Sequence, residues 1–314
     1  MKSVAVAVCL FTALLTGSAA IAQETEPADR LDDVIITAQR SGAPMWTVRD
    51  GDSVLILVGS IRAIPREVTW RPEALEEAAK RADLILLPQE GRASFSDILR
   101  VIWRARTITF MPEGQTTATY LSPDMQARLD VLMAGERNQD WRRRSMLMTS
   151  FDLIQDRAGF RAGREGRDAV DVVRRAARQG RIQARPVGTV RGDEMVDSLI
   201  TAPQTVHVPC MERAIAAAEA GPESSRERAQ DWRAFRVPEV VASPIEQALK
   251  VCWPWGDPEL APQLHQQWAA AVQTALVSPG VTMGVAPVRL LAEPGGVLDS
   301  LEARGLEVEG PEWK

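Results

Sequence analysis

Residues 46–62 have the sequence WTVRDGDSVLILVGSIR, which predicts a β-hairpin. A short strand, Trp46–Arg49, leads through a tight turn at Asp50-Gly51 into a long strand, Ser53–Gly59. Asp-Gly between two strand-like segments favours a type I′ turn, whose two central residues both need positive φ. The second strand is apolar without alternation, which indicates that both of its faces are buried. Ligands of open α/β sheets bind just past the carboxyl ends of central strands, so we expect any site near Ser60–Arg62.

The remaining pattern predicts an α/β (α+β) fold with a mixed central sheet. The sheet comes from the N- and C-terminal thirds of the chain, and a large helical insert lies between them, at about residues 193–277. Hydrophobic periodicity predicts helices at Pro72–Ala82, Phe95–Arg104, Ser122–Phe160 (with breaks near Gly135 and Thr149-Ser150), Asp168–Gln179 and Pro294–Arg304. Further strands are predicted at Asp83–Pro88, Thr107–Met111, Arg181–Val187, Val281–Ala286 and Leu306–Glu309.

The N-terminus is typical of a secretory signal. Lys2 is followed by the apolar run Val4–Leu15 and by small residues up to Ala22. A retained anchor is the alternative, but the run is shorter than the roughly 18 apolar residues that spanning requires. We therefore expect cleavage after Ala22 and a periplasmic or secreted protein with no membrane span. In the mature chain we expect a flexible lead-in at residues 23–43 and a single domain at 44–314. Residues 33–40 fit a brief strand or a docking segment.

The cysteine count changes with export. Cys9 leaves with the signal, whereas Cys210 and Cys252 remain as an even pair in an oxidising compartment. This favours one disulfide, worth about 4 kcal/mol in the chain-entropy account. Two buried free thiols are the alternative.

Charge and motifs exclude several classes of function. The formal net charge is −5, which argues against a nucleic-acid or anionic-membrane binder driven by overall charge. The chain has only two histidines, His207 and His265, and no His-Glu-x-x-His, Cys-x-x-Cys, Gly-x-Ser-x-Gly or phosphate-binding glycine loop. From these patterns we predict no metal and no cofactor. The run Arg142–Arg144 fits a solvated helix face.

The hairpin and the C-terminus together carry a resemblance. The N-terminal pattern is Pro44-Met-Trp-x-Val-x-Asp-Gly-Asp-Ser, an apolar strand and Gly-Ser-Ile, followed by Pro65, Trp70 and a helix leading to Ala82-Asp83. The C-terminal pattern has Trp268 on a helix, then a strand, then Pro294-Gly-Gly-Val-Leu-x-x-Leu-x-x-x-Gly-Leu-x-Val308. Over residues 44–314 the chain resembles the TraB/GumN family. The resemblance implies an EreA/ChaN-like α/β domain with a helical insert and, in active relatives such as the Tiki proteins, metal-dependent peptide hydrolysis.

The chain departs from that family at the residues that hold the metal. Active relatives use two Gly-x-x-His motifs, which here are Gly59-Ser-Ile-Arg62 and, with one inserted residue, Ala286-Pro-Val-Arg289. The first family glutamate falls near Pro88, with Glu90 two residues on; the second falls near Gly188, and the Arg-Asn pair before the C-terminal Trp is Leu264-His265. A guanidinium has no lone pair for a metal. The resemblance therefore implies a pseudoenzyme without the family's metal chemistry.

Three hypotheses follow for the function. In the first, Gly59, Ser60, Arg62, Glu90 and Arg289 form a cleft in which Arg62 and Arg289 bind a carboxylate or phosphate; the alternative is that both arginines pair with the protein's own acids. In the second, the protein is a hydrolase or peptidase with rearranged residues such as Ser60, Glu90 or His265. In the third, the helical insert docks a periplasmic protein partner through Trp253 and Trp255.

Overall fold

The computed structural model describes residues 34, 36, 41–161 and 167–314. The predicted signal and most of the lead-in lie outside these residues. Val34 and Ile36 are helical, which contradicts a strand at these two positions, and Val34 is fully buried in the main core. Within the described residues, no helix is both long and apolar enough to cross a membrane.

The predicted hairpin is confirmed, with its turn one residue later than expected. Strand β1 (Met45–Asp50) pairs antiparallel with β2 (Ser53–Ser60), and Asp50 is opposite Ser53. The two loop residues are therefore Gly51 and Asp52. Only Gly51 has positive φ, at 57°, as a type II′ turn requires of its first central residue. All eight residues of β2 are buried, as its unbroken apolar sequence predicts.

The main sheet confirms the predicted mixed α/β class. Its six strands follow the order β5-β3-β7-β2-β1-β8, in which β2, β7, β3 and β5 are parallel and the hairpin partner β1 and the edge strand β8 complete the mixed sheet. The bounds of the strands not yet given are β3 Leu84–Leu87, β5 Gln183–Pro186, β7 Gly280–Pro287 and β8 Val308–Glu309.

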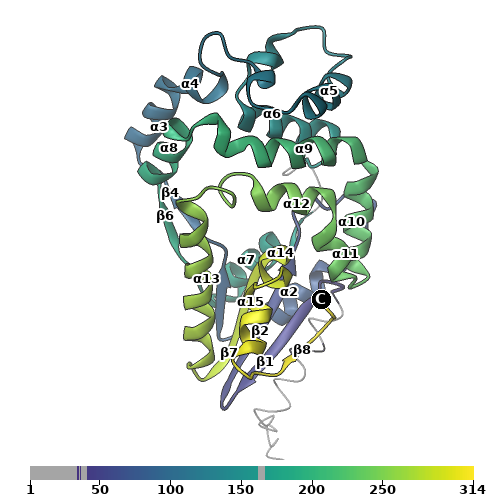
Figure 1. Cartoon of the computed structure of the whole chain (residues 1–314). Helices are drawn as coiled ribbons and strands as arrows, with labels where there is room; N and C mark the ends of the chain where they lie inside the picture. Colours follow the sequence, from purple (N-terminus) through teal and green to yellow (C-terminus); the bar gives the residue numbers. More distant parts are fainter. Residues whose placement is uncertain (1–33, 35, 37–40, 162–166) are drawn as a thin grey trace, which may run out of the picture.

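Helices cover both faces of this sheet (Figure 1). Helices α2 and α7 lie behind the strands, and α14 and α15 lie in front of them. The main hydrophobic core fills the space between the sheet and these helices. The bounds are α2 Pro72–Ala79, α7 Ala169–Gly180, α13 Leu260–Leu276, α14 Val288–Ala292 and α15 Val297–Ala303.

A second core lies in the helical part above the sheet. It is built around α9 and includes the predicted Cys210–Cys252 disulfide, which is confirmed. The helices of this part are α5 Pro123–Leu132, α6 Met146–Asp152, α9 Val208–Ala220, α10 Glu223–Arg233, α11 Val237–Ala242 and α12 Pro244–Val251. Short helical turns lie at η1 Thr117–Thr119, η2 Asp140–Arg143, η3 Leu153–Arg157 and η4 Gln204–His207.

A small second sheet was not predicted. Strand β4 (Glu90–Arg92) pairs in parallel with β6 (Thr189–Arg191), and each strand leads directly into a helix, α3 (Phe95–Trp103) or α8 (Gly192–Thr201). We term these four elements the arm; in Figure 1 it forms the upper left edge of the molecule. Strands of three residues are too short to show a period in the sequence.

Two predicted features of the helical part are wrong. Thr107–Met111 is not a strand: α4 (Ala105–Thr109) occupies most of it, and only Phe110 makes an isolated bridge, to Arg144. Thr107, Ile108 and Thr109 are β-branched, and the preference of such residues for strands is weak enough for tertiary context to override it. The break near Thr149-Ser150 is also absent, because α6 runs through it into η3 and the Ser150 hydroxyl donates to the Met146 carbonyl within the helix.

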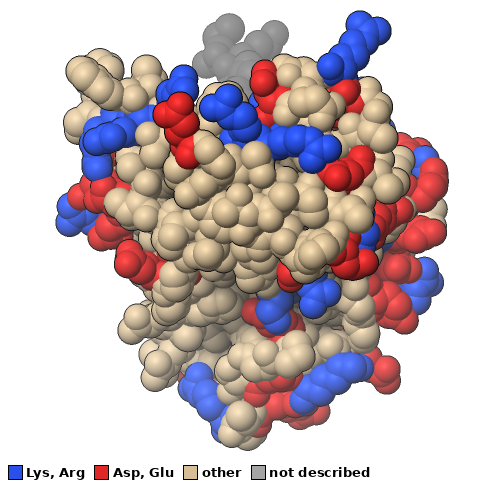
Figure 2. Space-filling model, turned by 45° about the horizontal axis from the view of Figure 1, so that its top comes forward, with Lys and Arg blue, Asp and Glu red and all other residues tan. Residues whose placement is uncertain are grey.

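In Figure 2 a broad area in the upper middle of the face carries no charged side chain, and the charged side chains above, beside and below it are mixed in sign. The expectation that the protein does not bind nucleic acid stays a prediction.

Candidate functional site

The register of the two central parallel strands places the two arginines of the sequence hypothesis at equivalent points. Gly59 of β2 is opposite Ala286 of β7, and Ser60 is opposite Pro287. Arg62 and Arg289 each follow three residues after this first pair. Both strands therefore end at the same edge of the sheet, where α/β proteins bind ligands.

A cavity of about 560 Å³ lies at this edge. Ser60 and Arg62 line it from the end of β2, and Arg289 lines it from the first turn of α14. Its other walls include Gly91, Val190 and Met195 of the arm, Asp168, Val170, Asp171 and Arg174 at the start of α7, and Glu246, Trp253 and Trp255 in and after α12. We term this cavity the cleft. Arg62 and Arg289 thus lie on one cleft, as the two-arginine hypothesis requires.

Arg289 is buried, with 8% of its surface exposed. Its guanidinium lies 3.6 Å from Glu246 Oε2 and 5.0 Å from the centre of the Trp255 ring. Burial lowers the pKa of Arg289, and the charges of Glu246 and Glu293 oppose that shift. An arginine starts from so high a value that the side chain stays a cation.

Glu246 is shared with a second buried arginine. Arg228 on α10 is 1% exposed and donates to Glu246 Oε1 at 2.7 Å and to the Arg62 carbonyl at 2.6 Å. Burial lowers the pKa of Arg228, against the charge of Glu246. Nearby, Lys250 pairs with Glu293 at 2.9 Å. We term Arg228, Glu246, Lys250, Arg289 and Glu293 the cationic cluster, because it holds three cations and two carboxylates.

Arg62 itself is exposed on the cleft wall. Its side chain forms no ion pair with another described residue, although it lies near Asp168. Burial raises the pKa of Asp168, and the Arg62 charge works in the opposite direction. The turn that carries Arg62 is held by the Arg228 bond to its carbonyl, and the next residue, Ala63, is buried with φ at 56°. A non-glycine residue in this conformation is uncommon and marks a turn fixed by its surroundings.

The comparison with protein families bears on this arrangement. The model of the TraB/PrgY/gumN family matches residues 44–310, which is most of the chain. The chain belongs to the TraB/PrgY/gumN family. No curated protein and no solved structure gives a significant match.

The metal site that the resemblance implies does not fit the residues of this cleft. Arg62 and Arg289 stand where the resemblance places imidazole ligands, and a guanidinium cannot donate a lone pair. Across residues 41–161 and 167–314, no three His, Cys, Asp or Glu side chains are grouped so that they could hold a metal ion.

The remaining residues of the sequence hypotheses have other places. Gly59 lies beside the site and acts through packing, because a Cβ there would be 3.1 Å from Trp46 and from Val288. Glu90 is exposed on β4 and does not line the cleft, so it does not neutralise the arginines. His265 is exposed and stacks edge-on against Trp255 at 5.6 Å, outside the cleft. The Ser60 hydroxyl donates to the Ala286 carbonyl at 2.9 Å. The three candidate catalytic residues are therefore not brought together.

Two residues at the centre of the cationic cluster, Arg228 and Glu246, are not among those predicted from the sequence. The sequence contains one signal for Arg228. Residues 225, 228, 229 and 232 follow a helical spacing, three of them are Ser, Ala and Trp, and in α10 all four are buried. Arg228 lies within this small and apolar face. Its partner is 18 residues away on another helix, so no local pattern links the two.

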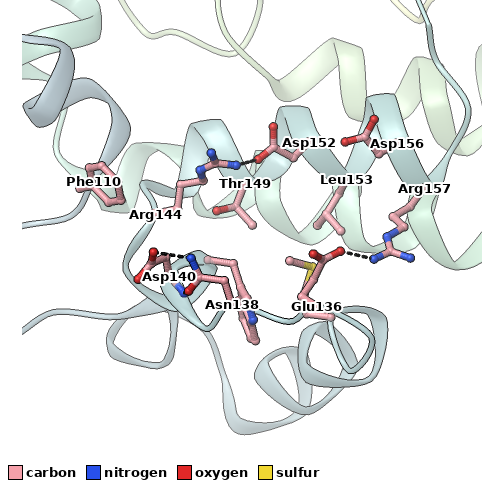
Figure 3. Close-up of a pocket in the computed structure, with 12 residues that line it drawn as sticks. Phe110, Glu136, Asn138, Asp140, Arg144, Thr149, Asp152, Leu153, Asp156 and Arg157 are labelled. Atoms are coloured by element: carbon pink, nitrogen blue, oxygen red, sulfur yellow. Dashed lines mark hydrogen bonds and ion pairs between the residues drawn. The ribbon is translucent and has the colours of Figure 1, made fainter.

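A second cavity, of about 510 Å³, lies in the helical part between α6, η2 and η3 (Figure 3). Its arginines already have acidic partners, Arg144 with Asp152 and Arg157 with Glu136. Burial raises the pKa of Asp152, and the Arg144 charge and hydrogen bond oppose the shift. Both guanidinium groups here are paired with carboxylates, and Asp140 and Asp156 also line the wall, so acids outnumber cations in this cavity.

Proposed function

We propose that this TraB/PrgY/gumN protein is an exported, non-catalytic member that binds a small carboxylate- or phosphate-bearing molecule in the cleft. The observation that carries the proposal is that Arg62 and Arg289 lie on one cavity at the carboxyl ends of β2 and β7. Guanidinium groups bind planar anions through two parallel hydrogen bonds, which gives both affinity and orientation.

The charges of the cationic cluster support an anionic ligand, because its three cations outnumber its two carboxylates. Two buried guanidinium groups, those of Arg228 and Arg289, share the single carboxylate of Glu246. The bond of Arg228 is short, at 2.7 Å, whereas that of Arg289 is longer, at 3.6 Å. A further anion beside Arg289 would complete the neutralisation of a buried cation, which is costly to leave unpaired.

The alternative, in which the protein's own acids satisfy both arginines, is met only in part, by Glu246 beside Arg289 and by the charge of Asp168 near Arg62. Arg62 is exposed on the cavity wall with no carboxylate bound to it among the described residues. The apolar wall of Trp253, Trp255 and Leu260 suits a ligand with an apolar portion next to its anionic group.

The binding proposal is tested by calorimetric titration with inorganic phosphate and with succinate. We expect at least one of them to bind, and we expect Arg62→Gln and Arg289→Gln each to weaken binding about tenfold or more, the usual scale for a charged hydrogen bond. Arg213→Gln is the matched control, because Arg213 is exposed on α9 away from the cleft. If neither anion binds, or if Arg62→Gln binds as the natural protein does, the proposal is wrong.

The absence of catalysis is tested separately. Metal analysis and a peptide-hydrolysis assay are made on the purified protein and on the double variant Arg62→His, Arg289→His. We expect no hydrolysis and no stoichiometric metal in the natural protein. Stoichiometric zinc, manganese or cobalt held near Ser60 would contradict the proposal.

A docking role for the tryptophans has less support. Trp253 and Trp255 are half-buried walls of the cleft, and the Trp253 indole donates to Ser198 Oγ. They therefore fit a ligand cavity better than a protein-binding surface.

A further inference from the structure

Helix α3 in the arm has its apolar side facing outward. Its large apolar residues are Phe95, Ile98, Leu99, Ile102 and Trp103, with exposed fractions of 75, 50, 48, 65 and 89%. The first four follow the spacing i, i+3, i+4, i+7, which normally marks the face that a helix buries. The one buried residue of α3 is polar: Asp97 caps the helix by accepting from the Ser94 backbone and hydroxyl groups.

This face is larger than scattered surface residues would explain. Five large side chains lie on one nine-residue helix, and Phe110, just after α4, is a further exposed aromatic residue at 38%. Exposed apolar patches of this kind mark interaction surfaces. In Figure 1, α3 and α4 lie at the outer edge of the molecule, where a flat surface can approach them.

The segment that carries the face is positively charged. Within residues 92–112 the chain has four arginines and one acid, Asp97, which is used in capping. Arg100 pairs with Asp197 on α8, whereas the exposed Arg92, Arg104 and Arg106 form no ion pair within the described part of the chain. This segment therefore has a local charge opposite in sign to the overall −5.

We propose that the apolar face of α3 with Arg92, Arg104 and Arg106 binds the arm to an anionic phospholipid surface. Phe, Ile, Leu and Trp on one face of a helix with arginines beside them are typical of helices that lie in the interfacial layer of a bilayer. Tryptophan prefers this layer, and each arginine gains attraction from anionic headgroups. Face-to-face pairing with a second copy would bring the same unpaired arginines together, which disfavours self-association.

The proposal is tested by sedimentation with vesicles of phosphatidylglycerol and phosphatidylcholine, and with vesicles of phosphatidylcholine alone. We expect binding to the anionic vesicles that weakens as salt is raised. The double variant Ile102→Ser, Trp103→Ser should bind at least tenfold more weakly, because two apolar side chains no longer enter the bilayer. The variant Arg104→Gln, Arg106→Gln should lose most of the preference for anionic lipid.

The matched control is Val131→Ser, Val277→Ser, which removes two valines that are 76 and 73% exposed elsewhere on the molecule. All variants have the same N-terminal residues, so a difference in vesicle binding between the α3 variants and the natural protein arises from the substituted side chains of α3 and its neighbouring arginines. Equal binding by the α3 variant and the control would overturn the proposal. So would a natural protein that is dimeric in solution, binds no vesicles and becomes monomeric on the α3 substitutions.

Discussion

Helices α7 and α3 have the same apolar spacing and opposite environments. In α7, residues 169, 172, 173, 176 and 177 are apolar and all buried against the sheet. In α3, residues 95, 98, 99 and 102 are apolar and all exposed. The contrast teaches that periodicity fixes which side of a helix is apolar, whereas the presence or absence of a neighbouring layer fixes whether that side is buried.

The largest expected effect is on α7, the helix whose apolar side is buried. Val173→Asp places an unpaired carboxylate in the main core, and we expect it to destabilise the fold by more than about 4 kcal/mol or to prevent folding. Ile102→Asp makes the equivalent change on α3 and should alter the free energy of unfolding by no more than about 0.5 kcal/mol. Chemical denaturation of both variants measures the difference. A large loss in Ile102→Asp would show that α3 is buried in solution.

Buried and exposed ion pairs should also differ in how much they stabilise the fold. Glu246→Gln leaves the buried Arg228 and Arg289 without their shared carboxylate, and we expect a loss of about 3–5 kcal/mol in the free energy of unfolding. Asp197→Asn breaks the exposed pair with Arg100, where water solvates both groups, and should cause no measurable loss. Denaturation curves of both variants measure these losses in the free energy of unfolding. Similar losses would contradict the assignment of Glu246 as the carboxylate shared by two buried arginines.

A smaller effect is expected at the end of α7. Arg181 has φ at 54°, a left-handed conformation that costs a side chain about 1 kcal/mol and costs glycine little. Arg181→Gly should therefore stabilise the protein by about 0.5–1 kcal/mol. Ala63, also at positive φ, is buried, so Ala63→Gly should gain less because it loses a packed methyl group. The melting temperatures of the two variants test this order.

The smallest expected effect concerns the two histidines. His207 is buried and burial lowers its pKa from the ordinary value of 6.5, against the charge of Asp257. The unfolded chain thus binds a proton more readily than the folded one, so stability is fully retained above about pH 6.5 and declines as pH falls below it. His207→Gln should reduce this decline, whereas His265→Gln, at an exposed residue, should leave it. Denaturation midpoints between pH 5 and 7.5 measure this loss of stability. An unchanged loss in His207→Gln would show that His207 does not cause it.

The part of the fold that could be predicted is the part whose signals are local. The hairpin, the strands β3, β5 and β7 and the helices α2, α7 and α13 follow from short patterns of apolar residues. The strands β4 and β6, the short helix α14 and the course of α6 do not, because these elements are short or their polar residues are satisfied by bonds within the helix. Of the candidate site, Ser60, Arg62 and Arg289 lie on the cleft and Gly59 and Glu90 do not.

The sequence by itself determined the mixed sheet, the buried central strand β2 and the family, because each depends on residue types at fixed spacings, and it favoured the Cys210–Cys252 disulfide because only two cysteines lie outside the predicted signal. Only the tertiary structure decided that Glu246 is shared by Arg228 and Arg289 and that the apolar side of α3 has no cover. The physical reason is that the energy of a charge or an apolar side chain depends on its neighbours in space. Those neighbours come from distant segments, which no local pattern specifies.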